Sequence, residues 1–335
     1  STLGPLPALG SALLLGLLAL LAATRIGHGG WYAAAAGATL LANLGWTATR
    51  PGLAENPDES LVAFVVQALA VAIFTLWPLL AVQRFSGDRL AWWTAALAGP
   101  AWFLPLRGLF ETGFGDAYIG VLPVALGALA LVAANRARTA LAEVEPLRHS
   151  ALVWLAAVAL CFLAVAIPLQ LEKEWITLGW ALEGLAVLAL WKRLDHPGLK
   201  YFGLALIGAT TVRLVANPAL LGYYPRSALR IVNWLLYTYL VPAAAMLGGA
   251  WLLRPLEAAR ARKWEKELYA RGHPFCANSS GFAAIVVVFV WINLTIADWF
   301  ATGQTLTLSF GDRPAQRLTV SIAWALYALI LLGLG

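Results

Sequence analysis

The chain has 335 residues, of which 61% are hydrophobic and only 12% are charged, with a formal net charge of +6. A water-soluble domain of this length has too little interior for so many apolar side chains, which excludes an ordinary soluble fold. Runs of about 20 apolar residues are typical of helices that cross a bilayer. We therefore expect an all-α protein, a polytopic transmembrane helix bundle.

Apolar stretches follow one another almost from end to end and predict about 11 spans. Several stretches are shorter than the hydrocarbon core requires at about 1.5 Å per residue, so flanking residues must complete them. Most of the 16 Trp are expected at the two membrane surfaces, where indole rings prefer the headgroup level. The predicted spans are 6–23, 31–47, 61–82, 90–106, 118–134, 151–169, 175–191, 201–216, 231–253, 282–297 and 319–335.

The predicted elements form three parts along the chain. Residues 1–254 hold about nine spans, residues 255–281 a charged cytoplasmic linker helix and loop, and residues 282–335 the last two spans. In the linker, Lys263, Glu267 and Arg271 follow one another at the spacing of ion pairs on a helix. Alternating polar and apolar residues around a Gly-Asp-Arg-Pro turn predict a short external β-hairpin near 305–320.

Charge in the loops orients the bundle. Most lysines and arginines fall in odd-numbered loops, whereas acidic residues lean toward even-numbered ones. The positive-inside rule then places the odd loops in the cytoplasm and the N-terminus outside. Orientation also accounts for the positive net charge, so membrane lipids are the expected partners and no nucleic acid is needed. Because the chain lacks an initiating Met and stops inside an apolar run, we expect it to be a segment of a longer protein.

Two plainly ionisable residues lie near the centres of predicted spans, Glu183 in the seventh and Arg213 in the eighth. A lone charge in lipid costs at least about 2.5 kcal/mol, so such residues are functional-site hypotheses. Consecutive antiparallel helices place the two at similar depth, which predicts a Glu183–Arg213 ion pair. A purely structural pair that fixes helix register is an equal alternative.

Other polar side chains lie in the outer halves or at the outer ends of the predicted spans, whereas the inner halves almost lack them. This asymmetry is typical of an outward-facing polar cavity, although interhelical hydrogen bonds are the alternative for each amide. Aromatic residues beside a charge suit a sugar or lipid headgroup and suit helix packing equally well. The candidate binding or gating residues are Glu183, Arg213, Trp180, Asn233, Tyr237, Asn43, Gln67, Asn293, Arg107 and Asp298.

The sequence contains no nucleophile triad, phosphate-binding glycine loop or metal-ligand cluster, and no cofactor or metal is predicted. His273 and Cys276 have a ligand-like spacing, but two ligands do not define a metal site, so we expect an ordinary loop there. Glu183 and Asp298 are the only acid–base candidates near the expected cavity, and no catalytic residue is assigned.

Several runs of sequence are similar to a known family. They are residues 166–169 (AIPL), 175–184 (WITLGWALEG), 233–237 (NWLLY), 318–321 (LTVS) and 324–327 (WALY). Together they resemble the bacterial family of large multi-pass membrane proteins known as domain of unknown function 2339. The resemblance covers most of the chain. It implies a bacterial inner-membrane protein with further spans, and it carries no activity.

Three functions follow from these patterns. The first is transport or binding of a polar solute or lipid headgroup in a cavity around Glu183 and Arg213. The second is a membrane enzyme acting on a lipid-linked or envelope glycan, which requires an acid or base in reach of that cavity. The third is a membrane scaffold without a ligand. The inner halves of the predicted spans almost lack polar side chains, which counts against transport, because a transporter also needs a polar path to the cytoplasm.

Overall fold

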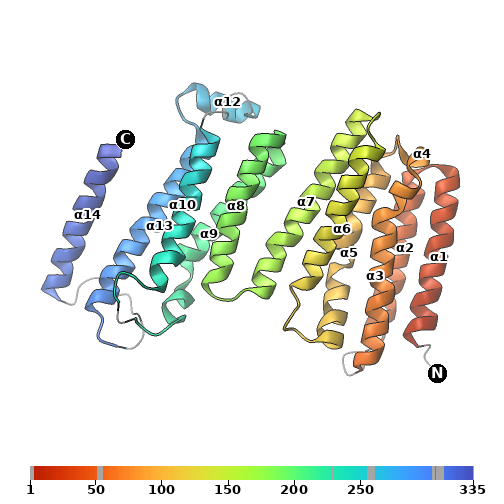
Figure 1. Cartoon of the computed structure of the whole chain (residues 1–335), viewed down its shortest axis with the longest axis horizontal. Helices are drawn as coiled ribbons and strands as arrows, with labels where there is room; N and C mark the ends of the chain where they lie inside the picture. Colours follow the sequence, from red (N-terminus) through yellow and green to blue (C-terminus); the bar gives the residue numbers. More distant parts are fainter. Residues whose placement is uncertain are drawn as a thin grey trace. The chain divides into compact units, whose positions relative to one another are not determined.

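Residues 4–50, 56–227, 229–254, 261–303, 306 and 313–334 are described by a computed structural model (Figure 1). Within these ranges all regular elements are helices. By their internal contacts, the residues divide into two compact units, Ser1–Gln170 and Leu171–Gly335, which we call unit 1 and unit 2.

Unit 1 is a bundle of antiparallel helices around α5. The closest packing joins α1 to α2, α3 to α5 and α6 to α7, and α5 also contacts α2, α6 and α7. These helices run from red to yellow-green in Figure 1. Their bounds are α1 (Pro5–Ile26), α2 (Gly29–Ala48), α3 (Pro57–Leu80), the short α4 (Val82–Phe85), α5 (Arg89–Phe114), α6 (Val121–Ala140) and α7 (Glu145–Gln170).

The core of unit 1 combines aromatic rings with small side chains. Tyr32 of α2 contacts Phe74 of α3 with ring centroids 6.2 Å apart, and its hydroxyl donates to the Phe74 carbonyl. Phe74 in turn stacks on Trp102 of α5 at 5.7 Å. Buried alanines surround these rings and let the helices approach closely, as is typical of bundles in membranes.

Unit 2 contains five long helices in its described part. α10 packs against α13 and α8, α8 packs against α9, and α13 also contacts α9, α12 and α14. In Figure 1 the short α12 lies across the end of α10 and α13. The bounds are α8 (Glu174–Leu194), α9 (Pro197–Ala216), the 3-10 helix η2 (Pro218–Gly222), α10 (Trp234–Leu253), α12 (Lys263–Ala270), α13 (Phe275–Phe300) and α14 (Pro314–Leu334).

Polar side chains just outside the apolar runs determine where several helices begin. His28 accepts a hydrogen bond from Gly30 N at the start of α2, and Asn56 caps α3. His196 and Asn233 cap α9 and α10 in the same way. Each cap satisfies a backbone N–H that has no partner within the helix. His28 and His196, which both lie between predicted spans, are therefore helix caps.

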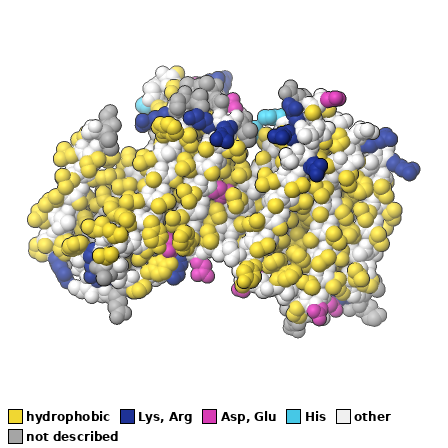
Figure 2. Space-filling view, viewed as in Figure 1, with side chains coloured by type: hydrophobic (Ala, Val, Ile, Leu, Met, Phe, Trp, Pro, Cys, Tyr) yellow, Lys and Arg dark blue, Asp and Glu magenta, His cyan; other side chains and the backbone are white. Residues whose placement is uncertain are grey.

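Nine helices in the described ranges are long and apolar enough to cross a membrane, which confirms the class of multi-pass membrane protein. Hydrophobic side chains accordingly cover most of the face seen in Figure 2 between its upper and lower edges. α2 and α5 coincide with two further predicted spans but are not among these nine, and α5 carries both Arg107 and Glu111. The total of about 11 spans stays a prediction.

The predicted β-hairpin near 305–320 is wrong in its second strand. Residues 317–320 lie in the first turns of α14, where Thr319 Oγ1 donates to the Ala315 carbonyl. Pro314 favours a helix start, because its fixed φ suits the first turn and its missing N–H costs nothing there. Of the first predicted strand, Leu306 alone belongs to the described residues, where it is buried and not in a strand.

The organisation near the linker also differs from the prediction. The linker helix exists as α12, but α13 begins at Phe275, well before the predicted tenth span. Cys276, expected in a loop, is therefore buried in the first turn of α13. Because α13 packs closely on α10, the last spans belong to the same compact unit as α8–α10. The main division of the chain falls after Gln170, inside the predicted bundle of residues 1–254.

Candidate functional site

The predicted Glu183–Arg213 ion pair does not form. Arg213, near the end of α9, donates from Nε to Thr177 Oγ1 at 3.2 Å and from Nη2 to the Lys173 carbonyl at 3.1 Å. It also donates from Nη2 to Tyr223 Oη at 3.1 Å. Both carboxylate oxygens of Glu183 are buried and have no hydrogen-bond partner in the described part of the chain. Thr177 lies almost two turns before Glu183 on α8, so Arg213 satisfies its charge near the end of the unit and not beside Glu183.

Arg213 supports an unusual backbone conformation. Lys173, the residue before α8, has φ 50° and ψ −126°, a region that non-glycine residues rarely occupy and that costs about 1–3 kcal/mol. Its carbonyl is held by Arg213, and its ammonium lies 4.2 Å from the ring centroid of Tyr224. Strained residues persist where their surroundings fix them, and they are common at binding sites.

Glu174 is a buried carboxylate that is only half satisfied. Its Oε1 accepts hydrogen bonds from the hydroxyls of Tyr224 and Tyr237, both at 3.0 Å. Its Oε2 is buried without a hydrogen-bond partner among the described residues. Burial and then the bond to Glu174 raise the pKa of Tyr224, so that hydroxyl remains a donor at neutral pH. Glu174 therefore keeps one acceptor oxygen that no described residue satisfies.

A second half-satisfied carboxylate lies at the end of α13. Asp298 Oδ1 is 2.7 Å from Arg226 Nε and 3.7 Å from Arg230 Nη1. Asp298 Oδ2 is buried and has no partner in the described ranges. Asp298 lines a recess of about 10 Å³, which is the space that a single water requires. The recess is also lined by Tyr224, Arg226, Ser227, Asn233, Trp234, Leu235 and Leu306.

These groups occupy one end of unit 2, where α8 and α10 begin and α9 and α13 end. The segment between α9 and α10 supplies the residues that cover this end, and Tyr224 packs edge-to-face on Trp234 at 5.6 Å. The site thus combines free acceptor oxygens, cations that are engaged by neighbours, and aromatic rings. We call it the polar cluster; its members are Lys173, Glu174, Thr177, Arg213, Asn217, Tyr223, Tyr224, Arg226, Arg230, Asn233, Trp234, Tyr237 and Asp298.

The polar cluster includes four of the predicted residues, Arg213, Asn233, Tyr237 and Asp298. Glu183 is not among them. Trp180 lies partly buried on α8, one turn before Glu183.

The other predicted residues lie elsewhere. Asn293 joins α13 to α14 by accepting from Trp324 Nε1 at 3.0 Å. In unit 1, Arg107 makes an i,i+4 ion pair with Glu111, while Asn43 and Gln67 are buried in α2 and α3. Neither Asn43 Oδ1 nor either amide atom of Gln67 has a hydrogen-bond partner in the described ranges.

Glu174, Tyr224 and Arg226 were not predicted. Sequence signals for them exist: two acidic residues flank Lys173 just before the seventh span, and Tyr-Tyr-Pro-Arg at 223–226 is an aromatic and basic run between apolar helices. Neither signal reveals that the loop folds back onto the starts of α8 and α10.

A different ionic cluster lies at the opposite end of unit 2, where α9 and α13 begin. Lys200 Nζ lies 2.7 Å from Glu265 Oε1 and 2.8 Å from Oε2, and both side chains are buried. The Cys276 thiol donates to Oε1 at 3.0 Å, and Arg262 N donates to Oε2 at 2.6 Å. We call Lys200, Glu265 and Cys276 the lysine clamp, because they hold α12 against α9 and α13.

Comparisons of the chain with models of protein families, with curated proteins and with solved structures found no match.

Proposed function

We propose that this multi-pass membrane protein binds, at the polar cluster of unit 2, a ligand that donates hydrogen bonds from an ammonium or hydroxyl group. A lipid headgroup or a sugar carries such groups. The observation that carries the proposal is a pair of buried acceptor oxygens, Glu174 Oε2 and Asp298 Oδ2, that have no hydrogen-bond partner among the described residues. A buried carboxylate oxygen without a donor costs free energy, and a ligand donor removes that cost.

The size of the recess indicates how the ligand meets the cluster. About 10 Å³ accommodates one small group, such as an ammonium or a hydroxyl, and excludes a whole sugar. The remainder of the ligand would lie outside the recess, against the rings of Tyr224 and Trp234, which line it. Aromatic rings beside polar acceptors are suited to headgroups that are polar at one end and apolar at the other.

The same geometry supports binding over transport and over catalysis. The transport hypothesis depends on a Glu183–Arg213 pair, and Arg213 instead bonds to Thr177, the Lys173 carbonyl and Tyr223. Asp298, the expected acid or base, has one oxygen fixed by Arg226 at 2.7 Å. Arg226 and Arg230 hold that oxygen in place, which suits a fixed acceptor better than a group that must exchange a proton with a substrate.

The membrane and its sidedness are part of the proposal. The resemblance to domain of unknown function 2339 suggests the bacterial inner membrane. The positive-inside rule suggests that the N-terminal residue of the segment and the polar cluster face outward. A headgroup of the outer leaflet is then the ligand source nearest to the cluster.

The test compares two lipids that differ in N–H donors. The purified full chain in detergent is titrated with phosphatidylethanolamine or phosphatidylcholine, and bound lipid is counted by native mass spectrometry. We expect phosphatidylethanolamine to bind at least about tenfold more tightly, because each hydrogen bond to a charged group contributes about 1.5–3 kcal/mol. A glycosyl diacylglycerol, which donates hydroxyls, is expected to bind as well. Equal binding of the two phospholipids together with no binding of the glycolipid would overturn the proposal.

Variants locate the binding. Asp298→Asn and Glu174→Gln each replace a carboxylate by an amide of the same shape and should reduce the preference for phosphatidylethanolamine. Glu111→Gln is the matched control, because Glu111 also pairs with an arginine near a helix end but lies in unit 1. If the control lowers the preference as much as the two cluster variants, the ligand does not bind at the polar cluster.

A further inference from the structure

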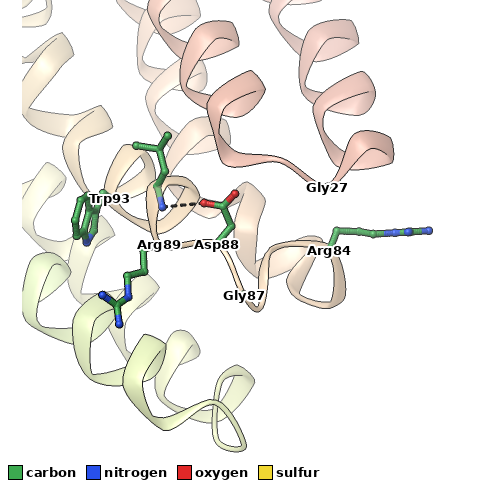
Figure 3. Close-up of a pocket in the computed structure, with 7 residues that line it drawn as sticks. Gly27, Arg84, Gly87, Asp88, Arg89 and Trp93 are labelled. Carbon is green, nitrogen blue, oxygen red and sulfur yellow. Dashed lines mark hydrogen bonds between the residues drawn. The ribbon is translucent and has the colours of Figure 1, made fainter.

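A second recess lies in unit 1, far along the chain from the polar cluster. It has a volume of about 550 Å³, which is within the range of small-molecule binding sites. It is formed where α1 ends, α2 begins and the α4–α5 corner turns (Figure 3). The lining residues are Gly27, Arg84, Gly87, Asp88, Arg89, Leu90 and Trp93.

The arginines of this recess are available for a ligand. Arg84 and Arg89 are exposed, and neither side chain makes a hydrogen bond or ion pair with any described residue. Figure 3 shows their side chains extending away from each other, with Asp88 between them. Since no described group pairs with these side chains, both guanidinium groups can meet an anion through two N–H donors at once.

The one carboxylate in the recess is occupied by the backbone. Asp88 Oδ1 accepts from Leu90 N at 2.9 Å and from Ala91 N at 3.4 Å, and Oδ2 accepts from Gly29 N. Asp88 therefore caps α5 and ties it to the start of α2. A side chain at Gly29 would collide with this carboxylate, since an added Cβ would lie 2.4 Å from Oδ1. Asp88 thus fixes the α4–α5 corner, and the two arginines remain as the charged groups that can contact a ligand.

Tryptophan marks the membrane surface at the recess. Trp93 Nε1 donates to Ser150 Oγ at 3.1 Å, and its ring lies 5.9 Å from that of Trp154. Both indoles are partly exposed, at 37% and 39%. Indole rings favour the headgroup level of a bilayer, so the recess lies where lipid phosphates are found.

The charges of unit 1 are separated between its two ends. The end with the recess carries six arginines against three acidic residues: Arg25, Arg84, Arg89, Arg136, Arg138 and Arg148 against Asp88, Glu143 and Glu145. The opposite end carries Arg50 and Arg107 together with Asp58, Glu59, Glu111 and Asp116. The right half of Figure 2, which shows unit 1, has mostly basic side chains along its upper edge and acidic ones along its lower edge. An anion is therefore attracted to the recess end by the whole unit.

We propose that this recess binds the phosphate groups of anionic membrane phospholipids, one phosphate at Arg84 and one at Arg89. The two side chains extend apart, so one phosphate cannot bridge them, whereas two neighbouring phosphatidylglycerols or one cardiolipin present two phosphates. Trp93 and Leu90 face the glycerol and the first acyl carbons. This site is independent of the polar cluster. It selects lipids with a net negative charge, whereas the polar cluster selects lipids that donate N–H or O–H hydrogen bonds.

The test uses the full chain in nanodiscs that contain phosphatidylcholine with a small fraction of cardiolipin or phosphatidylglycerol. Lipids that remain bound after release into detergent are counted by native mass spectrometry. In Arg84→Gln/Arg89→Gln, cardiolipin retention is expected to fall by about thirtyfold, the equivalent of about 1 kcal/mol for each basic residue. Arg84→Lys/Arg89→Lys keeps both charges and is expected to stay within a few-fold of wild type.

The matched control is Arg136→Gln/Arg138→Gln, which removes two exposed arginines from the same end of unit 1 but outside the recess. An equal loss in the control would reduce the effect to general surface charge and would overturn the site. Circular dichroism and gel filtration identify any variant that fails to fold. If the glutamine double variant fails to fold, two other variants test the site: Arg84→Lys/Arg89→Lys should retain cardiolipin, and Trp93→Leu should retain less of it. The opposite results would overturn the proposal. Displacement of cardiolipin by inorganic phosphate would assign the recess to a soluble anion and also overturn the proposal.

Discussion

The two ends of unit 2 each contain a buried glutamate, and the two glutamates are satisfied to different degrees. Glu265 receives donors on both oxygens, from Lys200, Cys276 and Arg262. Glu174 receives two tyrosine hydroxyls on one oxygen and none from a described residue on the other. A fully satisfied buried carboxylate stabilises a structure, whereas a half-satisfied one has capacity left for a ligand. This contrast distinguishes the structural lysine clamp from the candidate binding site.

The charge balance sharpens the contrast. In the lysine clamp, one cation and one anion lie within 2.8 Å and are removed from solvent together. In the polar cluster, the cations are held by neutral groups or carbonyls as much as by carboxylates, as Arg213 illustrates. The clamp is thus complete within the protein, while the cluster retains buried carboxylate oxygens that no described residue satisfies.

The largest effect is expected from breaking the lysine clamp. Lys200→Met removes the cation and leaves Glu265 buried without a counter-charge, which should lower the free energy of unfolding by about 3–5 kcal/mol. Thermal unfolding of the full chain in detergent measures the loss. The double variant Lys200→Met/Glu265→Met should recover most of it, because no buried charge then remains.

Cysteine labelling provides an independent measurement of the same prediction. Cys276 is 1% exposed in the intact clamp, so it should react slowly with a maleimide in a Cys161→Ser background. Lys200→Met should accelerate the reaction by releasing α12. Slow labelling and an unchanged melting temperature in that variant would show that the clamp contributes little.

Acid should reduce the stability that the lysine clamp contributes. Burial alone would raise the pKa of Glu265, but the bonds from Lys200, Cys276 and the Arg262 amide outweigh it and lower the pKa. The folded state therefore prefers the carboxylate. The resulting stabilisation is complete above the unfolded pKa of about 4.3 and is lost as the pH falls through the folded value. The difference in melting temperature between wild type and Glu265→Gln should shrink over that range; a constant difference would contradict the prediction.

Periodicity and composition predicted most of the helices, because each apolar run must satisfy its backbone internally in a membrane. The sequence also singled out Arg213 correctly as a residue that needs polar partners. It failed on the partner, because helix spacing gives depth but not the rotation of α8 about its axis. Thr177 and Glu183 point to different sides of that helix.

The polar cluster was only partly predictable for a related reason. Its loop residues Tyr224 and Arg226 gain their roles from contacts with Glu174 and Asp298, which are 50 and 72 residues distant along the chain. No local pattern encodes such a contact. Likewise, the linker ion pairs expected from the four-residue spacing gave no hint that Glu265 binds Lys200, which lies 65 residues away.

The polar cluster should respond to Arg213 and not to Glu183. Arg213→Leu removes three hydrogen bonds and releases the Lys173 carbonyl, so we expect a loss of about 1.5–3 kcal/mol in thermal unfolding. Glu183→Gln breaks no hydrogen bond to a described residue and replaces a buried acid that has no partner there, so it should leave stability unchanged or raise it. The two effects should add. Recovery of stability in the double variant would instead establish the ion pair that the sequence suggested.

The smallest effects concern the two tyrosines that donate to the same oxygen of Glu174. Tyr224→Phe or Tyr237→Phe leaves Oε1 with one donor at 3.0 Å, so each single variant should cost at most about 1 kcal/mol. The double variant leaves the buried carboxylate without either hydroxyl and should cost more than the sum of the singles, because the full desolvation penalty then applies. A double-mutant cycle by thermal unfolding measures this excess. Strict additivity would mean that Glu174 finds other donors, and that a half-satisfied carboxylate is not the feature that distinguishes the polar cluster from the lysine clamp.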